Sequence, residues 1–196
     1  MTGAGPTPET AQNGIQVSNG ALASISSSTI SGNECEDANV CGFSGTQAAG
    51  VLFFGAAPGS KITGSTVKEN DFGVYYFSEA PTQPTSSEVA ISTDVLSADR
   101  DEGVILDQGD ASVKGDTING PGHIGIDLLQ YEGQAYGVKS TASGDTIENM
   151  SVASVDVESD LQSGDFPGRF VITNSTITTN DAQSIVDASP SFTVLT

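Results

Sequence analysis

The stretch GSKITGSTVKENDFGVYYF, residues 59–77, decides the fold. It joins two phrases that recur along almost the whole chain. One is a Gly followed by alternating aliphatic or aromatic residues, here GVYYF at 73–77. The other is rich in Ser and Thr, carries spaced Ile or Val, and ends in Asn or Asp, here SKITGSTVKEN at 60–70. The alternation indicates short β-strands, and the Gly, Asn and Asp at the breaks indicate turns.

These phrases recur with a period that is typical of solenoids. One aliphatic residue can be taken as equivalent in each repeat, and the steps between these residues average roughly 28 residues. The equivalent residues are Ile15, Val51, Val74, Val104, Ile126, Val155 and Ile185. One such unit cannot bury its own apolar side and must stack on its neighbours. The sequence therefore predicts an all-β solenoid of about seven coils, with residues 14–196 as one domain and residues 1–13 as an N-terminal extension.

The residue pattern of the repeat resembles that of a known group of proteins. A strand of the form Gly-[Ile/Val]-x-[aliphatic], followed by x-[Ile/Val]-x-x-[Ser/Thr]-x-Ile-x-x-Asn, is similar to the right-handed parallel β-helix repeat family, the pectin-lyase-like proteins with carbohydrate-binding and sugar-hydrolase repeats. Asn33, Asn70 and Asn180 match the turn Asn of that family, whose amide bonds to the neighbouring coil. The resemblance implies a right-handed parallel β-helix over residues 14–187. It implies no particular reaction, because this fold carries many functions.

Charge and cysteine usage limit the partners and the location. The chain has 25 Asp and Glu against 6 Lys and Arg, a formal net charge of -19. We therefore expect no nucleic-acid partner, because its phosphates would be repelled, and no insertion into a membrane. Cys35 and Cys41 lie in one acidic loop without a nearby His or further Cys to complete a zinc site, and we expect a disulfide between them, with two free thiols as the alternative. A disulfide belongs in an oxidising compartment, so we expect a secreted or cell-surface protein.

The alternation also assigns an inner and an outer side to each strand of the first phrase. If the equivalent residues point inward, then the residues two positions later also point inward. These are Val17, Phe53, Tyr76, Leu106, Leu128 and Val157. The outer side then begins apolar and aromatic, with Leu52, Phe54, Tyr75 and Phe77, and ends acidic. Three interpretations stay open: the rings form a groove that stacks on a ligand, another part of the chain covers them as a satellite core, or they make a crystal or oligomer contact.

The acidic end of this outer side contains the candidate catalytic residues Asp107, Asp127 and Asp156. Adjacent coils lie about 4.8 Å apart, so Asp127 and Asp156 should stack, with Asp107 and Glu158 on the next column. Carboxylates this close repel one another, so at least one has a raised pKa or the group shares a cation. The expected metal ligands are Asp127 and Asp156, and the expected cofactor is Ca²⁺. The group then hydrolyses a glycosidic bond, holds Ca²⁺ beneath a uronate, or is a solvated acidic patch.

The candidate substrate-binding residues are Tyr75, Phe77, Phe54, Glu158 and His123. His123 lies in GPGHIGID, which resembles the Gly-His-Gly element of polygalacturonase-like hydrolases, except that Ile124 replaces the second Gly. The sequence favours an extracellular module that interacts with a poly- or oligosaccharide, and that is either a minimal glycoside hydrolase or lyase-like enzyme or a binding module.

The alternative is a non-catalytic structural or adhesive segment of a longer surface or fibre protein. Residues 1–12 contain no amphipathic helix that would cover the first coil, and SFTVLT at 191–196 has strand-like alternation without a polar capping unit. We therefore expect either that this chain is a segment of a longer protein or that copies associate through their ends or through the apolar face.

Overall fold

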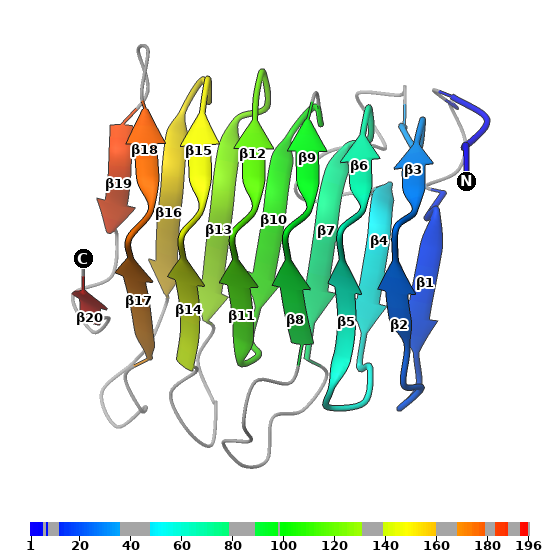
Figure 1. Ribbon diagram of the computed structural model, residues 1–196, viewed down its shortest axis with the longest axis horizontal. Helices are drawn as coiled ribbons and strands as arrows, with labels where there is room; N and C mark the ends of the chain where they lie inside the picture. Colours follow the sequence, from blue (N-terminus) through cyan, green and yellow to red (C-terminus); the bar gives the residue numbers. More distant parts are fainter. Residues whose placement is uncertain are drawn as a thin grey trace.

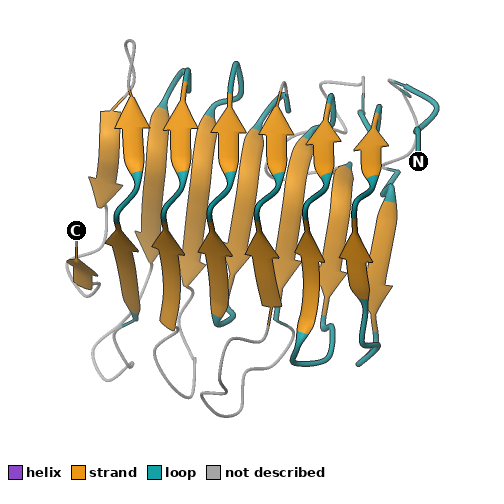
Figure 2. Ribbon diagram, in the orientation of Figure 1, coloured by secondary structure: helices purple, strands orange, loops and turns teal. Residues whose placement is uncertain are grey.

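The computed structural model describes residues 1–5, 7, 12–35, 48–78, 89–97, 99–130, 139–159, 168–178, 183–187 and 193–195. Within this part of the chain every regular element is a β-strand (Figure 2). The strands form three parallel sheets, and each strand pairs with its equivalent in the next coil (Figure 1). The protein is an all-β, right-handed parallel β-helix, as the sequence predicts.

Sheet 1 forms one side of the solenoid and contains the first phrase of the repeat. Its seven strands, in spatial order, are β1 (Ile15–Ser18), β4 (Ala49–Phe54), β7 (Phe72–Phe77), β10 (Glu102–Asp107), β13 (Ile124–Gln130), β16 (Ala153–Ser159) and β19 (Gln183–Asp187).

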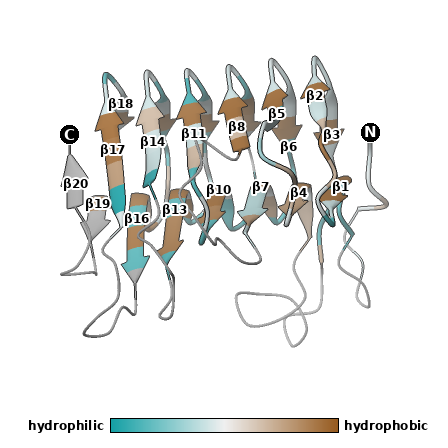
Figure 3. Ribbon diagram, turned by 90° about the horizontal axis from the view of Figure 1, so that it is seen from below, coloured by the Kyte–Doolittle hydropathy of each residue, from teal (hydrophilic) through white to brown (hydrophobic). Residues whose placement is uncertain are grey.

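Sheets 2 and 3 form the opposite side (Figure 3). Sheet 2 contains β2 (Ser24–Ser26), β5 (Ser60–Thr63), β8 (Val89–Ser92), β11 (Ala111–Lys114), β14 (Lys139–Ser143), β17 (Arg169–Thr173) and β20 (Thr193–Leu195). Sheet 3 contains β3 (Thr29–Ser31), β6 (Thr66–Lys68), β9 (Val95–Ser97), β12 (Thr117–Asn119), β15 (Thr146–Glu148) and β18 (Thr176–Thr178).

The second phrase of the repeat is two strands, not the single strand that its alternation predicts. Between the two strands of each coil lies a residue with a positive φ angle: Ser27, Gly64, Thr93, Gly115, Gly144 or Asn174. A residue in this left-handed region bends the chain, and Gly and Asn adopt that conformation at the lowest cost. The phrase is therefore divided between sheet 2 and sheet 3.

The predicted register of sheet 1 is confirmed. Ile15 pairs with Val51, and the same column continues through every equivalent residue to Ile185. Val51, Val74, Val104, Ile126 and Val155 are all fully buried in one continuous core. Facing side chains from the other sheets, such as Ile62 and Ile118, complete this core. Burial of these columns is the main favourable contribution to the stability of the solenoid.

A column of polar side chains holds the coils in register at the bend between sheets 2 and 3. Its members are Ser28, Ser65, Asp94, Asp116, Asp145 and Ser175, and each side chain after the first accepts a hydrogen bond from the backbone N–H of the preceding member. The three Asp side chains are buried. Because a buried N–H without an acceptor is costly, this polar column favours one alignment of neighbouring coils.

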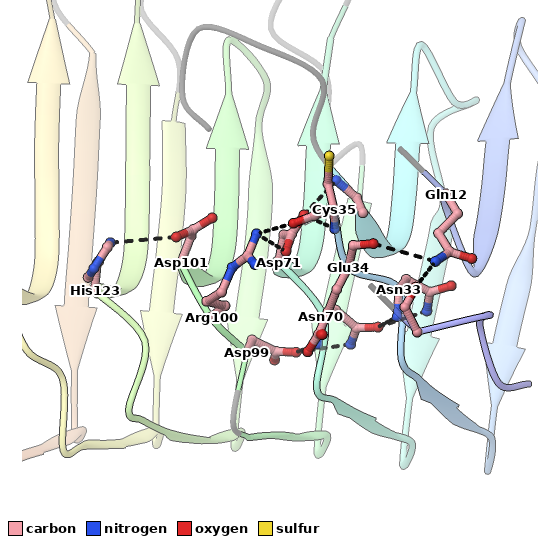
Figure 4. Close-up of polar contacts among 12 residues, drawn as sticks. Gln12, Asn33, Glu34, Cys35, Asn70, Asp71, Asp99, Arg100, Asp101 and His123 are labelled. Carbon is pink, nitrogen blue, oxygen red and sulfur yellow. Dashed lines mark hydrogen bonds and ion pairs between the residues drawn. The ribbon is translucent and has the colours of Figure 1, made fainter. Parts of the chain in front are cut away.

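The turn after sheet 3 contains a second, shorter ladder. The Nδ2 group of Asn33 donates to Asn70 Oδ1 at 2.7 Å, and Nδ2 of Asn70 donates to Asp99 Oδ1 at 2.9 Å (Figure 4). The ladder predicted for Asn33 and Asn70 is therefore present, and it continues in an Asp. Asn180 lies outside the described residues.

The first residues of the chain lie along sheet 3. Thr2 and Thr7 form parallel bridges with Ser31 and Cys35, and the N–H of Gly3 donates to the carbonyl oxygen of Ser31 at 2.7 Å. The described part of the N-terminal extension thus adds backbone pairing beside β3. Association of copies through the remaining edges stays a prediction.

Candidate functional site

The outer face of sheet 1 is built from two columns of outward side chains. In one, Leu52 is followed by Tyr75, Ile105, Asp127 and Asp156. In the other, Phe54 is followed by Phe77, Asp107, Leu129 and Glu158. The stacking predicted for Asp127 on Asp156 is therefore confirmed. The early coils carry only apolar and aromatic residues in these columns, and the carboxylates lie in the later coils beside Ile105 and Leu129.

The early coils carry a group of rings, Phe54, Phe77 and Tyr75, which we call the aromatic shelf. The rings of Phe54 and Phe77 are stacked, with centroids 5.0 Å apart and an interplanar angle of 23°. Phe54 is 36% exposed although it is large and apolar. The hydroxyl of Tyr75 donates to Asp107 Oδ2 at 2.9 Å, so the shelf is joined directly to the first carboxylate.

The middle of the outer face is buried. Ile105 and Leu129 point away from the core of the solenoid but are only 3% and 4% exposed, and they form a second apolar cluster with Ala49 and Phe72. A single β-sheet surface in water would leave such side chains open. A satellite core, one of the interpretations that the sequence left open, is therefore present at the centre of this face, and Leu52 and Tyr75 pack against it.

The later coils carry five carboxylates, Glu102, Asp107, Asp127, Asp156 and Glu158, which we call the acidic cluster. Asp127 is 1% exposed, and neither of its carboxylate oxygens has a hydrogen-bond partner within the described residues. Glu102, Asp107 and Asp156 are also buried, whereas Glu158 is exposed. Buried carboxylates without donors are strongly disfavoured in the ionised form.

The cluster is therefore held partly protonated near neutral pH. Burial raises the pKa of Glu102 to about 9, and the charge of Asp127 adds to this rise. Burial also raises the pKa of Asp127 to about 8, with further contributions from Glu158 and Asp156. The pKa values of Asp107, Asp156 and Glu158 are raised as well, mainly by desolvation. Protonated and ionised carboxyl groups side by side can act as an acid and a base in the same site.

No metal centre is built from the side chains that the structure describes. Among them, no group of three or more His, Cys, Asp and Glu residues is arranged to hold an ion. Asp127 and Asp156, the predicted Ca²⁺ ligands, supply two stacked carboxylates. A protein-bound Ca²⁺ ion takes about six to eight oxygen ligands. Calcium binding therefore stays a prediction.

His123 does not join the aromatic shelf. It lies just before the first residue of β13, whereas Phe54 and Phe77 lie at the last residues of β4 and β7. Its Nδ1 is 3.6 Å from Asp101 Oδ1 (Figure 4). Its side chain is 60% exposed. The other predicted catalytic and substrate-binding residues lie on the outer face of sheet 1, spread over β4 to β16, and His123 lies apart from them.

Glu102 was not predicted from the sequence, although a signal for it exists. It pairs with Phe72 and Ile124 at a position of the repeat that is apolar in the neighbouring coils. A charged residue in an otherwise apolar column is the kind of local inconsistency that marks a functional or strained site.

The sequence also did not predict a polar network beside the Asn33–Asn70–Asp99 ladder. The Nη2 group of Arg100 lies 2.6 Å from Asp71 Oδ1 and donates to the carbonyl oxygen of Cys35 at 2.8 Å (Figure 4). The other oxygen of Asp71 accepts hydrogen bonds from the N–H groups of Cys35 and Ala48. One carboxylate therefore fixes the backbone on both sides of residues 36–47.

Cys35 is buried and, within the described part of the chain, is not a free thiol. Its predicted partner, Cys41, lies outside the described residues. The Cys35–Cys41 pairing therefore stays a prediction.

The chain matches no protein-family model. No curated protein is significantly similar to it. In the described ranges there is no helix long and apolar enough to cross a membrane. What the geometry defines is a parallel β-helix solenoid with an aromatic and acidic outer face on sheet 1.

Proposed function

We propose that the protein is an extracellular, carbohydrate-interacting β-helix module that binds a poly- or oligosaccharide on the outer face of sheet 1. The observation that carries this proposal is the continuity between the aromatic shelf and the acidic cluster, made by the Tyr75–Asp107 hydrogen bond. An exposed ring such as Phe54 offers a flat apolar surface to the C–H face of a sugar, and carboxylates accept its hydroxyl hydrogens.

The proposal also places the protein among the pectin-lyase-like β-helices and gives it an activity, the hydrolysis of a glycosidic bond. A glycosidase needs one carboxyl group that donates a proton and a second that acts as base or nucleophile. Asp127, with its pKa raised to about 8, supplies the protonated group, and the more accessible Glu158 supplies the other. In this step the glycosidic C–O bond breaks and the leaving oxygen takes the proton of the Asp127 carboxyl. The anomeric carbon forms its new bond either to a water that gives its proton to Glu158 or to Glu158 itself, and water then hydrolyses that second bond.

The test is a glycan array with Ca²⁺ and with a chelator, followed by titration of any ligand found. Phe54→Ala and Phe77→Ala should each weaken binding about tenfold, since one stacked ring contributes on the order of 1 kcal/mol or more. Leu22→Ala is the matched control, because Leu22 is an exposed apolar residue outside sheet 1. No ligand on the array, or equal losses in all three variants, contradicts the proposal.

The second candidate is a non-catalytic structural or adhesive segment. It is favoured by the burial of Ile105 and Leu129, because a covered outer face is one that packs instead of binding. Under this alternative the Phe54→Ala and Phe77→Ala variants lose stability or self-association and have no ligand to lose. Sedimentation of the same variants separates the two candidates.

A further inference from the structure

The charges of this protein are sorted onto opposite sheets. The strands of sheet 1 contain six acidic residues and no basic one. The strands of sheet 2 contain four basic residues and no acidic one. These four are Lys61, Lys114, Lys139 and Arg169. In a chain of net charge -19 this separation places four of the six basic residues in the strands of sheet 2.

The four cations of sheet 2 are exposed and make no ion pair with any described residue. The other two cations of the chain, by contrast, are paired: Lys68 with Glu69 at 3.0 Å, and Arg100 with Asp71. Among the described residues, therefore, only the cations of sheet 2 are left for an external partner to neutralise.

The cations are spread both along the axis of the solenoid and across the strands. Lys61 lies in β5, Lys114 two coils later in β11, and Lys139 and Arg169 in the next two coils, where they are register partners. With about 4.8 Å between coils, the four cations span roughly 19 Å along the axis. Across the strands, Lys61 is level with Thr141, Lys114 is level with Ser143 at one end of β14, and Lys139 and Arg169 lie at the other end. A polyanion that lies over the whole face would meet all four cations.

The side chains between these cations are small and hydroxylated. Ser112 and Thr141 are register partners, and Thr63 accepts a hydrogen bond from Ser92 at 3.2 Å. No strand of sheet 2 presents an outward aromatic ring, and Phe170 is fully buried. This surface offers charge and hydroxyl donors, without the stacking platforms that single-stranded nucleic acids use.

We propose that the outer face of sheet 2 binds an acidic polysaccharide whose carboxylate or sulfate groups pair with Lys61, Lys114, Lys139 and Arg169. The overall negative charge does not prevent this, because at physiological salt the field of exposed charges is screened within about 8 Å. The site is separate from the aromatic shelf and the acidic cluster, so the proposal does not depend on the function of sheet 1.

The test uses immobilised polygalacturonate, dextran sulfate, uncharged dextran and single-stranded DNA at low ionic strength. Binding to at least one of the two acidic polysaccharides is expected, and which of them binds identifies carboxylate or sulfate as the preferred group. Lys139→Gln/Arg169→Gln should weaken that binding about tenfold, and added salt should weaken it further. Lys68→Gln removes one positive charge from sheet 3 and should change the affinity for the acidic polysaccharide less than about twofold.

Several results would overturn the proposal. They are no binding to either acidic polysaccharide, binding of uncharged dextran as tight as theirs, equal effects of the Lys68 and Lys139/Arg169 variants, or preferential binding of the DNA. The Leu22→Ala variant, which changes an exposed apolar residue outside sheets 1 and 2, should bind the acidic polysaccharide like the wild type. A loss in that variant as large as the loss in Lys139→Gln/Arg169→Gln would end the case for sheet 2.

Discussion

The polar column at the bend between sheets 2 and 3 provides the sharpest test of how this solenoid is held in register. Asp116 is at its centre: Oδ1 accepts from the N–H of Asp94 at 2.6 Å, and Oδ2 accepts from the N–H of Lys114 at 2.9 Å. One bond joins neighbouring coils and the other lies within a coil. Asp116→Ala removes both acceptors from a site that is 1% exposed. Asp116→Ser keeps the bond between coils, as Ser65 does when it accepts from Ser28.

The magnitude follows from the number of donors left without a partner. A buried N–H that loses its acceptor costs about 1–3 kcal/mol, so Asp116→Ala should lower the free energy of unfolding by about 4 kcal/mol. Asp116→Ser leaves one N–H unpaired and should cost about 2 kcal/mol. The natural occurrence of Ser at three other positions of the column makes it a matched replacement.

The assay is urea unfolding followed by circular dichroism, at about pH 5 and about pH 8. Burial raises the pKa of Asp116 from 3.8 to about 7, so the folded state retains a proton that the unfolded state has already lost. Its contribution to stability is therefore complete below about pH 4 and is lost as the pH rises through about 7. Both variants should reduce this loss. Equal stability of the Ala and Ser variants, or a stability difference below about 0.5 kcal/mol from wild type, would refute the role given to the column.

Four further predictions concern the core, the acidic cluster, the network at Asp71 and the cysteines. Val104→Asp should unfold the protein, with a loss above about 4 kcal/mol, because it places an unpaired charge in a fully buried column; a near-normal melting temperature would disprove the register. The wild-type melting temperature should fall as the pH rises from about 7 to about 9, because Glu102 and Asp127 then lose protons that burial retains, and Glu102→Gln should flatten this slope; an unchanged slope contradicts it. Arg100→Ala should cost about 1–2 kcal/mol, since Asp71 is buried and Arg100 is half-exposed, whereas a change within the error of urea unfolding would show that the ion pair contributes nothing. Mass spectrometry of protein made under oxidising conditions should show Cys35 joined to Cys41, and two alkylated thiols after non-reducing digestion would exclude the bond.

The fold could be predicted in unusual detail because the repeat carries its own alignment. Taking Val74 and Val104 as equivalent fixed the register of a whole sheet, since side chains alternate with a period of two and a slip by one residue would expose the core. The bend at Gly64 was not predicted, because the same alternation continues on both sides of it. Only a positive φ angle, which Ser27 and Thr93 also adopt, shows that one phrase belongs to two sheets.

The sequence predicted most residues of the candidate site but did not predict how deeply they are buried. Alternation correctly placed Asp127 on Asp156, but it left open whether the outer face is covered, and Ile105 is 3% exposed. Periodicity shows which side chains point outward and does not show which of them are buried. Asp116 was missed for a related reason: a polar residue before Thr117 looks like an ordinary turn residue, and its burial appears only when the coils are stacked.

The polar column also shows that coil length and coil stacking are independent in this chain. Its successive members are separated by 37, 29, 22, 29 and 30 residues, yet every one bonds to the next. The strands therefore advance by a constant pitch of about 4.8 Å per coil, whatever length of chain connects them. Peptides of different lengths grafted between the strands of successive coils would therefore be held side by side at this constant spacing.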